Sequence, residues 1–586
     1  MRGARVALAL ALVACSSDAP LVETASSSSI VRDPASGQLW VTSPDDDALV
    51  EIDAASGAER SRVAIPGEPQ EIAWAGSTRV VTLGRVAGVA LVDPTGAVSS
   101  LAIGCGWTRS VASLRGRTFV TCPDDDRVIE LDVARRRVVW TIDLPGEPTA
   151  LALAGTHLAV TLARAHSLVT FDLASGGAPS PVASTALPID TGRAASQPAA
   201  IAAEARGGFA VVYQSVANDG PRDLSPASGG YGALVDGHPR IEPLVFGPCG
   251  DRYARFDGGE LAMSGPSAIA FGGGLVWIAN LYTDNVLVAR CTPASATPAN
   301  GTLDVLATFR VGRAPRGIAL SADGRSAFVD LGYDWAVARL DAPSSRAMTR
   351  LDATWTMRRT RRSAHLSDAA LRGRSLFFDA VDTHLTPSGV VTCGTCHPRG
   401  GDDGLSWFLH TPNLPRKLRR TLPAWGARMA LAPYHWDGQF ADAATLAQTT
   451  THELMNGDGL LVAFDDIATY MSELAPPPPR PIEDMAAVLR GQALFASAGC
   501  TTCHPGTLFA DRAFHTVIPI PADPAAALAN VDTPSLVAIR ARSPFFHDGS
   551  APTLRDTIAV LEGTHTTTAT LTPSEIDDLV TYMESL

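Results

Sequence analysis

Residues 39–53 read LWVTSPDDDALVEID, which is a short apolar strand, a polar turn and a second apolar strand. Six further stretches between about residues 35 and 352 repeat this pattern, three of them closely and three more loosely. They begin at Arg79, Thr118, His157, Gly208, Leu275 and Ser326. The early copies are spaced by about forty residues, enough for one four-stranded sheet. A lone sheet cannot bury both faces, so we predict an all-β, seven-bladed propeller over residues 34–352.

Two acidic runs recur at one position of this repeat, Asp45–Asp47 in the first copy and Asp124–Asp126 in the third. Such carboxylates could ligate a metal, but their recurrence in the polar turn favours turn and capping roles. Residues 218–263 interrupt the repeat with a Gly-rich stretch, which we predict to be a surface loop. The strand pairs resemble those of the bacterial YVTN-type propellers, in which one such pair recurs in each blade.

The C-terminal third contains two copies of a different pattern. The matching segments, in the same order, are RGRSLFF (372–378) and RGQALFA (490–496), CGTCH (393–397) and CTTCH (500–504), APYHWDG (432–438) and SPFFHDG (543–549), and DDIATYMSEL (465–474) and DDLVTYMESL (577–586). We therefore expect two copies of one all-α domain, at residues 365–475 and 482–586. Each copy is predicted to have an N-terminal helix, a C-x-x-C-H loop, intervening turns and a closing amphipathic helix. The proline run after Ala475 predicts a stiff linker between them.

C-x-x-C-H is the attachment signature of c-type haem, so both domains are expected to be cytochrome-c-like. The two thiols form thioethers with the porphyrin, and the adjacent histidine supplies an imidazole ligand to the iron. A redox dithiol or half of a zinc site could use the same spacing, but here the motif occurs twice, each time after RG-x-x-LF. We predict two covalently bound haems, on Cys393, Cys396 and His397 and on Cys500, Cys503 and His504.

The N-terminus has the layout of an export signal, because Arg2 and Arg5 precede a short apolar run that ends at Cys15. The run is too short to span a bilayer. Residues 12–15, LVAC, also resemble a bacterial lipobox, in which the cysteine is lipidated, and the serine that follows favours the outer membrane. We expect a lipoprotein signal at 1–15, a tether at 16–33, and an outer-membrane anchor on Cys15, facing the periplasm or the cell surface. A cleaved signal with a chance cysteine is the alternative.

Four of the nine cysteines lie outside the lipobox and the C-x-x-C-H motifs: Cys105, Cys122, Cys249 and Cys291. An even remainder in an oxidising compartment predicts disulfides. Of the three possible pairings, we favour 105 with 122 and 249 with 291.

The chain carries 47 basic and 60 acidic residues, a formal net charge of -13, without a basic stripe. This balance argues against a nucleic-acid partner. No segment after the N-terminal run is long and apolar enough to cross a bilayer, so we expect membrane contact through the lipid anchor alone.

Residues 365–586 resemble the bacterial dihaem cytochrome c peroxidases and their relative that matures the tryptophan-derived cofactor of methylamine dehydrogenase. Besides the two C-x-x-C-H motifs, the resemblance rests on WDG at Trp436, FH at Phe514, and TPSL and FFHDG between Thr533 and Gly549. It implies that the first haem reacts with peroxide and that the second delivers electrons. It also implies that Trp436 lies between the haems as an electron bridge, the alternative being a buried packing aromatic.

The second copy departs from this family at its sixth iron ligand. Where the peroxidases have a methionine, this chain has Leu561, which cannot ligate iron. His515, His547 and His565 are the nearby alternatives, and we favour His565 because it lies closest to the lost position.

The first copy departs on the distal side of its haem. The peroxidases place a glutamine and then a catalytic glutamate after W-D-G, and Gln448 and Glu453 are present here at a much shorter spacing. Three histidines could also approach this iron: His410, His435 and His452. A histidine ligand would block peroxide, whereas an open site beside Glu453 or His435 would permit acid–base assistance. The family's interdomain calcium site lacks a clear counterpart of its asparagine near Thr421, so calcium has little support.

Three functions are compatible with these features. In the first, a small redox protein or quinol-linked donor reduces the second haem, and electrons pass Trp436 to the first. Hydrogen peroxide, or a protein substrate as in the maturation enzyme, reacts there, with His397 as proximal ligand and Glu453 or His435 as acid–base group. In the second, both irons carry two histidines and the protein transfers electrons without catalysis. In the third, the propeller recognises a protein, polymer or small ligand. We favour the first.

Overall fold

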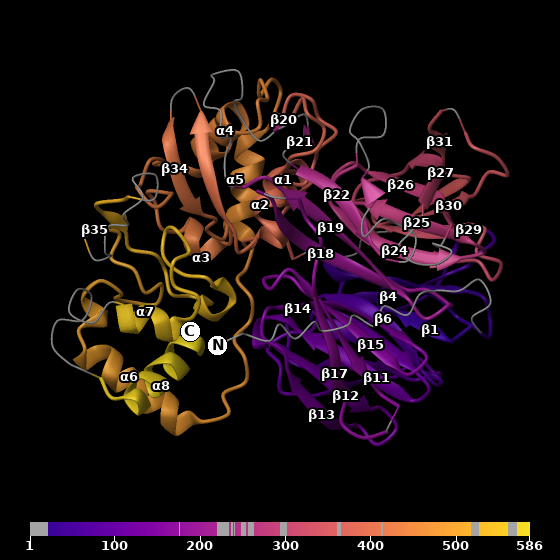
Figure 1. Cartoon of the computed structure of the whole chain (residues 1–586), viewed down its shortest axis with the longest axis horizontal. Helices are drawn as coiled ribbons and strands as arrows, with labels where there is room; N and C mark the ends of the chain where they lie inside the picture. Colours follow the sequence, from indigo (N-terminus) through magenta and orange to yellow (C-terminus); the bar gives the residue numbers. More distant parts are fainter. Residues whose placement is uncertain are drawn as a thin grey trace, which may run out of the picture.

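The computed structural model describes residues 21–174, 176–190, 192–218, 234–235, 238–239, 241–247, 254–255, 263–292, 302–347, 349–359, 365–411, 414–516, 527–560 and 571–586. Seven sheets are arranged radially (indigo to pink in Figure 1), and a helical region lies beside them (orange to yellow). The predicted fold class, a seven-bladed propeller followed by a helical region, is confirmed. Among these residues no helix is long and apolar enough to cross a membrane.

Each blade is a sheet of four antiparallel strands built from the inside outwards, and in blade 6 a fifth strand is added in parallel at the outer edge. Blade 1 holds β2 (Ile30–Arg32), β3 (Leu39–Ser43), β4 (Ala48–Ile52) and β5 (Glu59–Ala64); blade 2 holds β6 (Pro69–Ala75), β7 (Thr78–Leu83), β8 (Val89–Val92) and β9 (Val98–Leu101); blade 3 holds β10 (Val111–Leu114), β11 (Arg117–Cys122), β12 (Arg127–Asp132) and β13 (Arg137–Asp143); blade 4 holds β14 (Pro148–Ala154), β15 (His157–Leu162), β16 (Ser167–Asp172) and β17 (Ser180–Ala186).

The other blades follow the same order. Blade 5 holds β18 (Ala194–Ala203), β19 (Phe209–Val216), β22 (Ile241–Phe246) and β23 (Ala254–Arg255); blade 6 holds β24 (Pro266–Gly272), β25 (Leu275–Asn280), β26 (Asn285–Thr292) and β27 (Thr302–Arg310), with β31 (Leu351–Asp352) at its outer edge; blade 7 holds β28 (Pro315–Leu320), β29 (Ser326–Leu331), β30 (Ala336–Asp341) and β32 (Trp355–Arg358). Second strands such as β3 and β25 are buried along their whole length, because neighbouring blades cover both of their faces.

Part of the stretch predicted to be a surface loop is a blade strand. β22 pairs with β19 along six residues and is buried at its first five positions, and β23 extends the same sheet. The loop prediction was wrong for these residues, since blade 5 takes its third and fourth strands from within the interruption. β20 (Leu234–Val235) and β21 (His238–Pro239) form a separate hairpin in the same stretch.

The first described strand does not belong to blade 1. β1 (Thr24–Ser26) pairs with β14, the inner strand of blade 4, and contacts β10 and β18, the inner strands of the blades on either side. It therefore lies inside the ring of inner strands, before the chain continues into β2 and blade 1.

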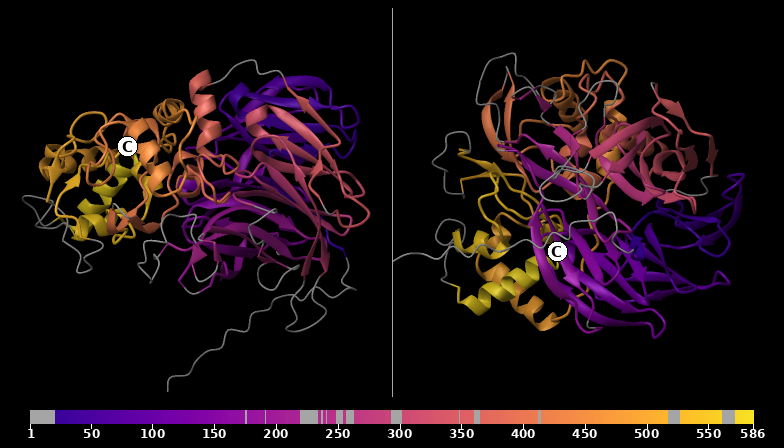
Figure 2. Two further views of the ribbon diagram at one scale, coloured as in Figure 1. Left: turned by 90° about the horizontal axis from the view of Figure 1, so that it is seen from above. Right: turned by 45° about the vertical axis from the view of Figure 1, so that its right-hand side comes forward.

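The helical region packs on one face of the propeller, as Figures 1 and 2 both show. This face is formed by the turns that follow the second strand of each blade. All seven of these turns contribute a residue that contacts the helical region or the linker: Asp45, Arg85, Asp125, Arg164, Asn218, Tyr282 and Tyr333. This face of the propeller is thus covered by another part of the same chain.

The acidic runs have the predicted turn roles. Asp47 and Asp126 adopt left-handed backbone (φ 48° and 51°), and each accepts hydrogen bonds from two backbone N–H groups of the loop that leads to the next blade. The runs also dock the helical region, because Asp45 pairs with Arg374 at 2.7 Å and Asp125 pairs with Arg540 at 2.9 Å. This second role depends on residues more than 300 positions away and has no signal in the repeat.

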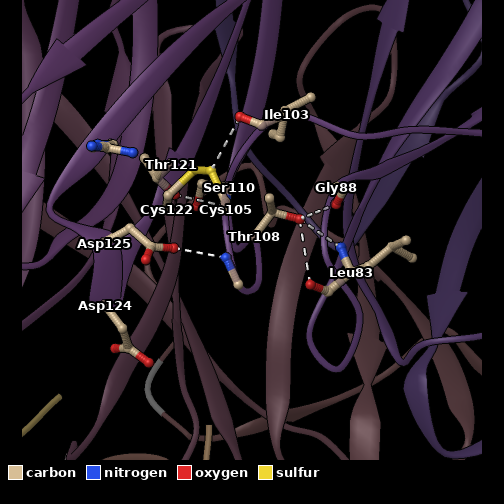
Figure 3. Close-up of a disulfide and its surroundings, with 12 residues drawn as sticks. Leu83, Gly88, Ile103, Cys105, Thr108, Ser110, Thr121, Cys122, Asp124 and Asp125 are labelled. Carbon is tan, nitrogen blue, oxygen red and sulfur yellow. Dashed lines mark hydrogen bonds between the residues drawn. A yellow bond between two sulfur atoms is a disulfide. The ribbon is translucent and has the colours of Figure 1, made fainter. Parts of the chain in front are cut away.

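A disulfide joins Cys105 to Cys122, as predicted (Figure 3). It links the loop before β10 to the end of β11, next to the turn that carries Asp125. In that turn the Asp125 carboxylate accepts a hydrogen bond from Gly106 N at 2.8 Å. Cys291 is also disulfide-bonded, and Cys249 lies outside the described residues.

The helical region contains two similar halves and a short hairpin. The first half holds α1 (Asp368–Phe377), α2 (Cys393–Cys396), β33 (Ser406–Thr411), β34 (Leu414–Arg420), α3 (Gly426–Met429), α4 (Ala443–Glu453) and α5 (Phe464–Glu473); the second holds α6 (Met485–Ser497), the 3-10 turn η6 (Cys500–Thr502), β35 (Phe514–His515), β36 (Val531–Asp532), the 3-10 turn η7 (Ile539–Arg542), α7 (Leu554–Val560) and α8 (Pro573–Glu584). The β33–β34 hairpin replaces turns that were expected after the first C-x-x-C-H motif.

Equivalent residues hold each half together. A Cβ added to Gly373 in α1 would lie 1.9 Å from Asp466 O in α5, and one added to Gly491 in α6 would lie 2.0 Å from Asp578 O in α8. Glycine therefore permits the same close helix crossing in both halves. The neighbouring arginines, Arg372 and Arg490, pair with the carboxylates of these same two aspartates at 2.7 Å.

Two candidate haem cavities

The first cavity lies beside Cys393, Cys396 and His397 and has about 1500 Å³ of empty space, part of it open to solvent. At the start of α2, Thr392 N donates a hydrogen bond to Thr395 Oγ1 at 3.0 Å. His397 Nδ1 lies 3.2 Å from Gly401 O, a contact that fixes the imidazole and makes Nε2 the nitrogen that would face an iron.

The second cavity lies beside Cys500 and His504 and has about 1000 Å³ of empty space, also partly open. His504 Nδ1 lies 2.7 Å from Phe509 O, which repeats the arrangement at His397. The thiols of all four C-x-x-C-H cysteines are free of disulfides.

In the first motif both thiols and the oriented imidazole line the cavity. In the second, Cys500 and His504 line it, whereas the Cys503 thiol does not and lies within 4.8 Å of ligand atoms of Asp511 and His515. An oriented imidazole beside a thiol and a large space suits a c-type haem in each half.

One wall is shared by the two cavities. Arg420, at the end of β34, and Trp436 line both of them. Trp436 Nε1 donates a hydrogen bond to Arg420 O at 2.9 Å, and Arg420 N donates to His547 O at 2.7 Å. The rings of Trp436 and His547 meet edge to face, with their centroids 6.3 Å apart. Trp436 therefore lies at the wall between the two cavities.

Buried guanidinium groups at this wall fit the carboxylates that a porphyrin carries. Arg420 and Arg542 are 3% and 4% exposed, and the Nε atom of each lacks a hydrogen-bond partner among the described residues. Burial, followed by repulsion from Arg420, lowers the pKa of Arg542 to about 9. A guanidinium group that is buried away from water is stabilised by a nearby anion. The propionates of a haem in the second cavity would supply such an anion.

The two cavities differ at one equivalent position. His435 lines the first and Phe546 lines the second, and they hold the same place in APYHWDG and SPFFHDG. Both have left-handed backbone, φ 71° and 67°. Burial lowers the pKa of His435, and its Nδ1 lies 3.3 Å from Gln439 Oε1. The first cavity thus presents a titratable ring where the second presents an apolar one.

The other predicted residues are distributed unevenly. Glu453, at the end of α4, lines the first cavity together with His435 and His397, whereas Gln448 and His452 are exposed and do not line it. His515 pairs with Asp511 at 2.8 Å and does not line the second cavity. The side chain of His410, and both Leu561 and His565, lie outside what the structure describes.

The propeller covers the attachment loop of the first cavity. Gln197 Nε2 donates a hydrogen bond to Thr395 O at 2.6 Å, and the Tyr282 hydroxyl donates to Gly394 O at 2.7 Å. Gly394 and Thr395 are buried. The corresponding residues of the second motif, Thr501 and Thr502, are exposed.

Sequence reasoning missed the two buried arginines at this wall. Arg420 and Arg542 belong to no motif, and their positions depend on where β34 and η7 end in space. The difference between His435 and Phe546 did have a signal, because the two repeated segments align them directly.

The sequence profile of the cytochrome c family matches residues 488–586. This segment is the second half of the helical region, which is therefore a cytochrome c domain with a covalently bound c-type haem. A search of curated proteins finds no match to this chain.

Solved structures show distant similarity to parts of the chain. A hydrazine synthase chain of Kuenenia stuttgartiensis is 16% identical over 58% of this chain and 99% of its own length, with a TM-score of 0.44. A MauG-like protein associated with microbial copper homeostasis is 18% identical over 38% of this chain and 89% of its own, with a TM-score of 0.31. Virginiamycin B lyase of Staphylococcus aureus is 10% identical over 52% and 92%, with a TM-score of 0.36. Similarities this distant carry no argument about function.

Proposed function

We propose that this chain is a dihaem, peroxidase-like oxidoreductase. In this proposal the first half of the helical region also carries a haem, on Cys393, Cys396 and His397, and hydrogen peroxide is reduced beside it. The observation that carries the proposal is the difference between the cavities: the first is lined by His435 and Glu453, and the second has Phe546 at the position equivalent to His435. Acid–base groups are needed where peroxide reacts and not where electrons merely pass.

The reaction takes up two electrons and two protons and converts hydrogen peroxide into two water molecules. The haem iron supplies the oxygen chemistry when bound, with His397 as its protein ligand. His435 or Glu453 removes a proton from the oxygen that binds and returns it to the oxygen that leaves, which makes the departing group water rather than hydroxide. The lowered pKa of His435 keeps its imidazole neutral and able to accept that proton.

Electrons are proposed to enter through the cytochrome c domain. The attachment loop of that domain is exposed at Thr501 and Thr502, so a small redox protein or quinol-linked donor can approach it. The equivalent loop of the first half lies under Gln197 and Tyr282 and is closed to such a donor. Trp436, which lines both cavities, then lies on the path from one to the other.

The place of action is a separate proposal. An outer-membrane lipoprotein anchored through Cys15 would be consistent with covalent haem and with the Cys105–Cys122 disulfide, both of which belong to an oxidising compartment. Labelling of the intact protein with a radioactive fatty acid, and loss of that label in Cys15→Ser, would test the anchor.

The alternative is an electron-transfer protein in which both irons carry two protein ligands. The position of His435 in the first cavity favours it specifically, because its imidazole could serve as a second protein ligand to an iron held by His397. In that case the site would be closed to peroxide.

Electron paramagnetic resonance of the ferric and half-reduced protein separates the two. We expect a high-spin ferric signal that is lost when hydrogen peroxide is added, together with turnover of peroxide in the presence of a reduced donor. Low-spin signals alone, unchanged by peroxide in every redox state, would contradict the enzyme and support the electron-transfer protein.

A further inference from the structure

A buried ionic cluster joins the propeller to the wall between the two cavities. Arg164, in the turn after β15, pairs with Asp402 at 2.8 Å, and the same carboxylate oxygen pairs with Arg420 at 2.8 Å. The Asp402 and Arg420 side chains are 0% and 2% exposed. Burial opposes ionisation of Asp402, but Arg164 and Arg420 outweigh it and hold the pKa of Asp402 below its usual value.

Arg164 contacts both halves of the helical region. Besides Asp402 in the first half, it donates hydrogen bonds to the carbonyl oxygens of Ala541 and Ser543 in the cytochrome c domain. Its Nε pairs with Glu147 of its own blade at 3.1 Å. One propeller side chain, itself anchored, thus reaches both halves at their junction.

Arg420 connects the ionic cluster of Arg164 and Asp402 to the wall shared by the two cavities. Its side chain donates hydrogen bonds to Asp402 at 2.8 Å and to Arg542 O at 2.6 Å. Its backbone carbonyl accepts the Trp436 indole N–H, and its backbone N–H donates to His547. Arg420 therefore has contacts to the cluster on one side and to the aromatic pair on the other.

We propose that Arg164 is a positioning residue of the propeller: through Asp402 it fixes Arg420 and Trp436, and so sets the rate of electron transfer between the two haem sites. This inference rests on the proposed function only in requiring a haem in each cavity. Arg164 touches neither cavity, so its effect is on geometry rather than on chemistry. A guanidinium group is needed at position 164 because it donates hydrogen bonds to the Asp402 carboxylate of the first half and to two carbonyl oxygens of the cytochrome c domain at the same time.

The test uses the full-length holoprotein and compares Arg164→Met, Arg164→Lys and Arg399→Met. Arg399 is the matched control, because it crosses the same interface to the same Glu147 at 3.1 Å but is exposed and does not contact Asp402. Haem content and thermal unfolding are measured first, so that loss of folding is recognised. Electron transfer between the haems is then followed in half-reduced protein after a light-induced reduction pulse, and both reduction potentials are recorded.

We expect Arg164→Met to slow transfer on the order of tenfold or more, since small displacements in a reacting geometry cost rate on that scale. Arg164→Lys should restore the potentials by keeping the charge but not the rate, because an ammonium cannot reproduce the geometry of the guanidinium. Arg399→Met should match the wild type in both. Equal rates in all four proteins, equal slowing in both methionine variants, or full rescue of the rate by lysine would each overturn the inference.

Failure of the two proposals is distinguishable. A wild-type protein that exchanges electrons between two haems but does not turn over peroxide would contradict the proposed function and leave this inference intact. A wild-type protein with one haem per chain would overturn the inference directly.

Discussion

His435 and Phe546 show how one side chain can separate two sites that share a backbone. Both residues have a left-handed backbone conformation. Each lies in a loop closed by an isolated β-bridge, which pairs Tyr434 with Phe440 in one half and Phe545 with Ala551 in the other. The repeat thus supplies the same backbone conformation at this position of both cavities, and the side chain that it carries decides whether a proton can be moved there.

Replacement of His435 by phenylalanine makes the first cavity like the second at this position. We expect His435→Phe to lower peroxide turnover on the order of a hundredfold, because a positioned acid–base group contributes at about that level. The ferric spin state should stay unchanged. Steady-state kinetics and electron paramagnetic resonance of the same sample check both. His452→Phe is the control, since His452 is exposed outside the cavity and its loss should leave turnover intact. Conversion of a low-spin to a high-spin signal in His435→Phe would instead identify His435 as an iron ligand.

At this scale the fixed spacing of C-x-x-C-H led to the six attachment residues, and the family resemblance led to Trp436; their roles stay predictions. The sequence could not predict Arg420, Arg542 or Asp402. Their roles come from contacts across the two halves and the propeller, such as the pairing of Asp402 with an arginine 238 positions away.

The helix crossings of the two halves depend on glycine in a way that can be measured. In α6, a Cβ on Gly491 would lie 2.0 Å from Asp578 O and 2.7 Å from Tyr582 Cβ, so α8 would have to move. We expect Gly491→Ala to lower the free energy of unfolding of the cytochrome c domain by about 1–3 kcal/mol, as overpacked contacts do. Urea unfolding of the full chain, followed at the haem absorbance, measures it.

Its neighbour provides the control. Gln492 is exposed on α6, so Gln492→Ala should change the unfolding free energy by no more than about 0.5 kcal/mol. An alanine at position 491 that is tolerated equally well would mean that the crossing is looser than described.

Among the elements, the repeats of the propeller and the paired N- and C-terminal helices could be predicted, because periodicity and echoed segments mark them. β22 could not be predicted, since it lies within the Gly-rich interruption of the repeat and is recognisable as a strand only by its pairing with β19 in blade 5. The β33–β34 hairpin was missed for a different reason: β34 reads LPRKLRR, and its density of basic residues gives no alternating apolar signal.

The interface between propeller and helical region contains carboxylates that should make the whole molecule sensitive to pH. Burial, together with the nearby carboxylates of Asp379 and Asp334, raises the pKa of Asp284 to about 7. Asp379 belongs to the helical region, and burial raises its pKa as well. An aspartate in the unfolded chain ionises near pH 4, so between about pH 4 and 7 the native state binds more protons. Stability from this group therefore falls as the pH rises through that window.

Asp284→Asn should remove this part of the pH dependence while its side-chain oxygen can still accept the bond from Ala314 N. We expect the variant to be more stable than the wild type by about 4 kcal/mol at pH 8, since the pKa differs by about three units between the two states, with the difference shrinking towards pH 4. Thermal unfolding across this range measures it.

Asp53→Asn is the control for the same range. Hydrogen bonds, foremost from Ser56 N, lower the pKa of Asp53 to about 2, so it is ionised in both states above pH 5. Its substitution should leave the slope unchanged. A parallel pH profile for Asp284→Asn and wild type would show that Asp284 is hydrated in the native protein.

How the propeller and the helical region join was beyond the reach of the sequence. The acidic turns could be placed in the repeat, but the arginines that meet them lie hundreds of residues later and in no shared pattern. The docking face is a property of the assembled ring, because seven separate turns form it.

The strand inside that ring has a consequence for the order of events during synthesis. Thr24–Ser26 leave the ribosome before the rest of the propeller, yet their partners, Ala152–Ala154, are made only with the fourth blade. β1 therefore has no β14 to pair with until the first three blades have been translated. The propeller therefore closes around a strand that is synthesised before any of the seven blades.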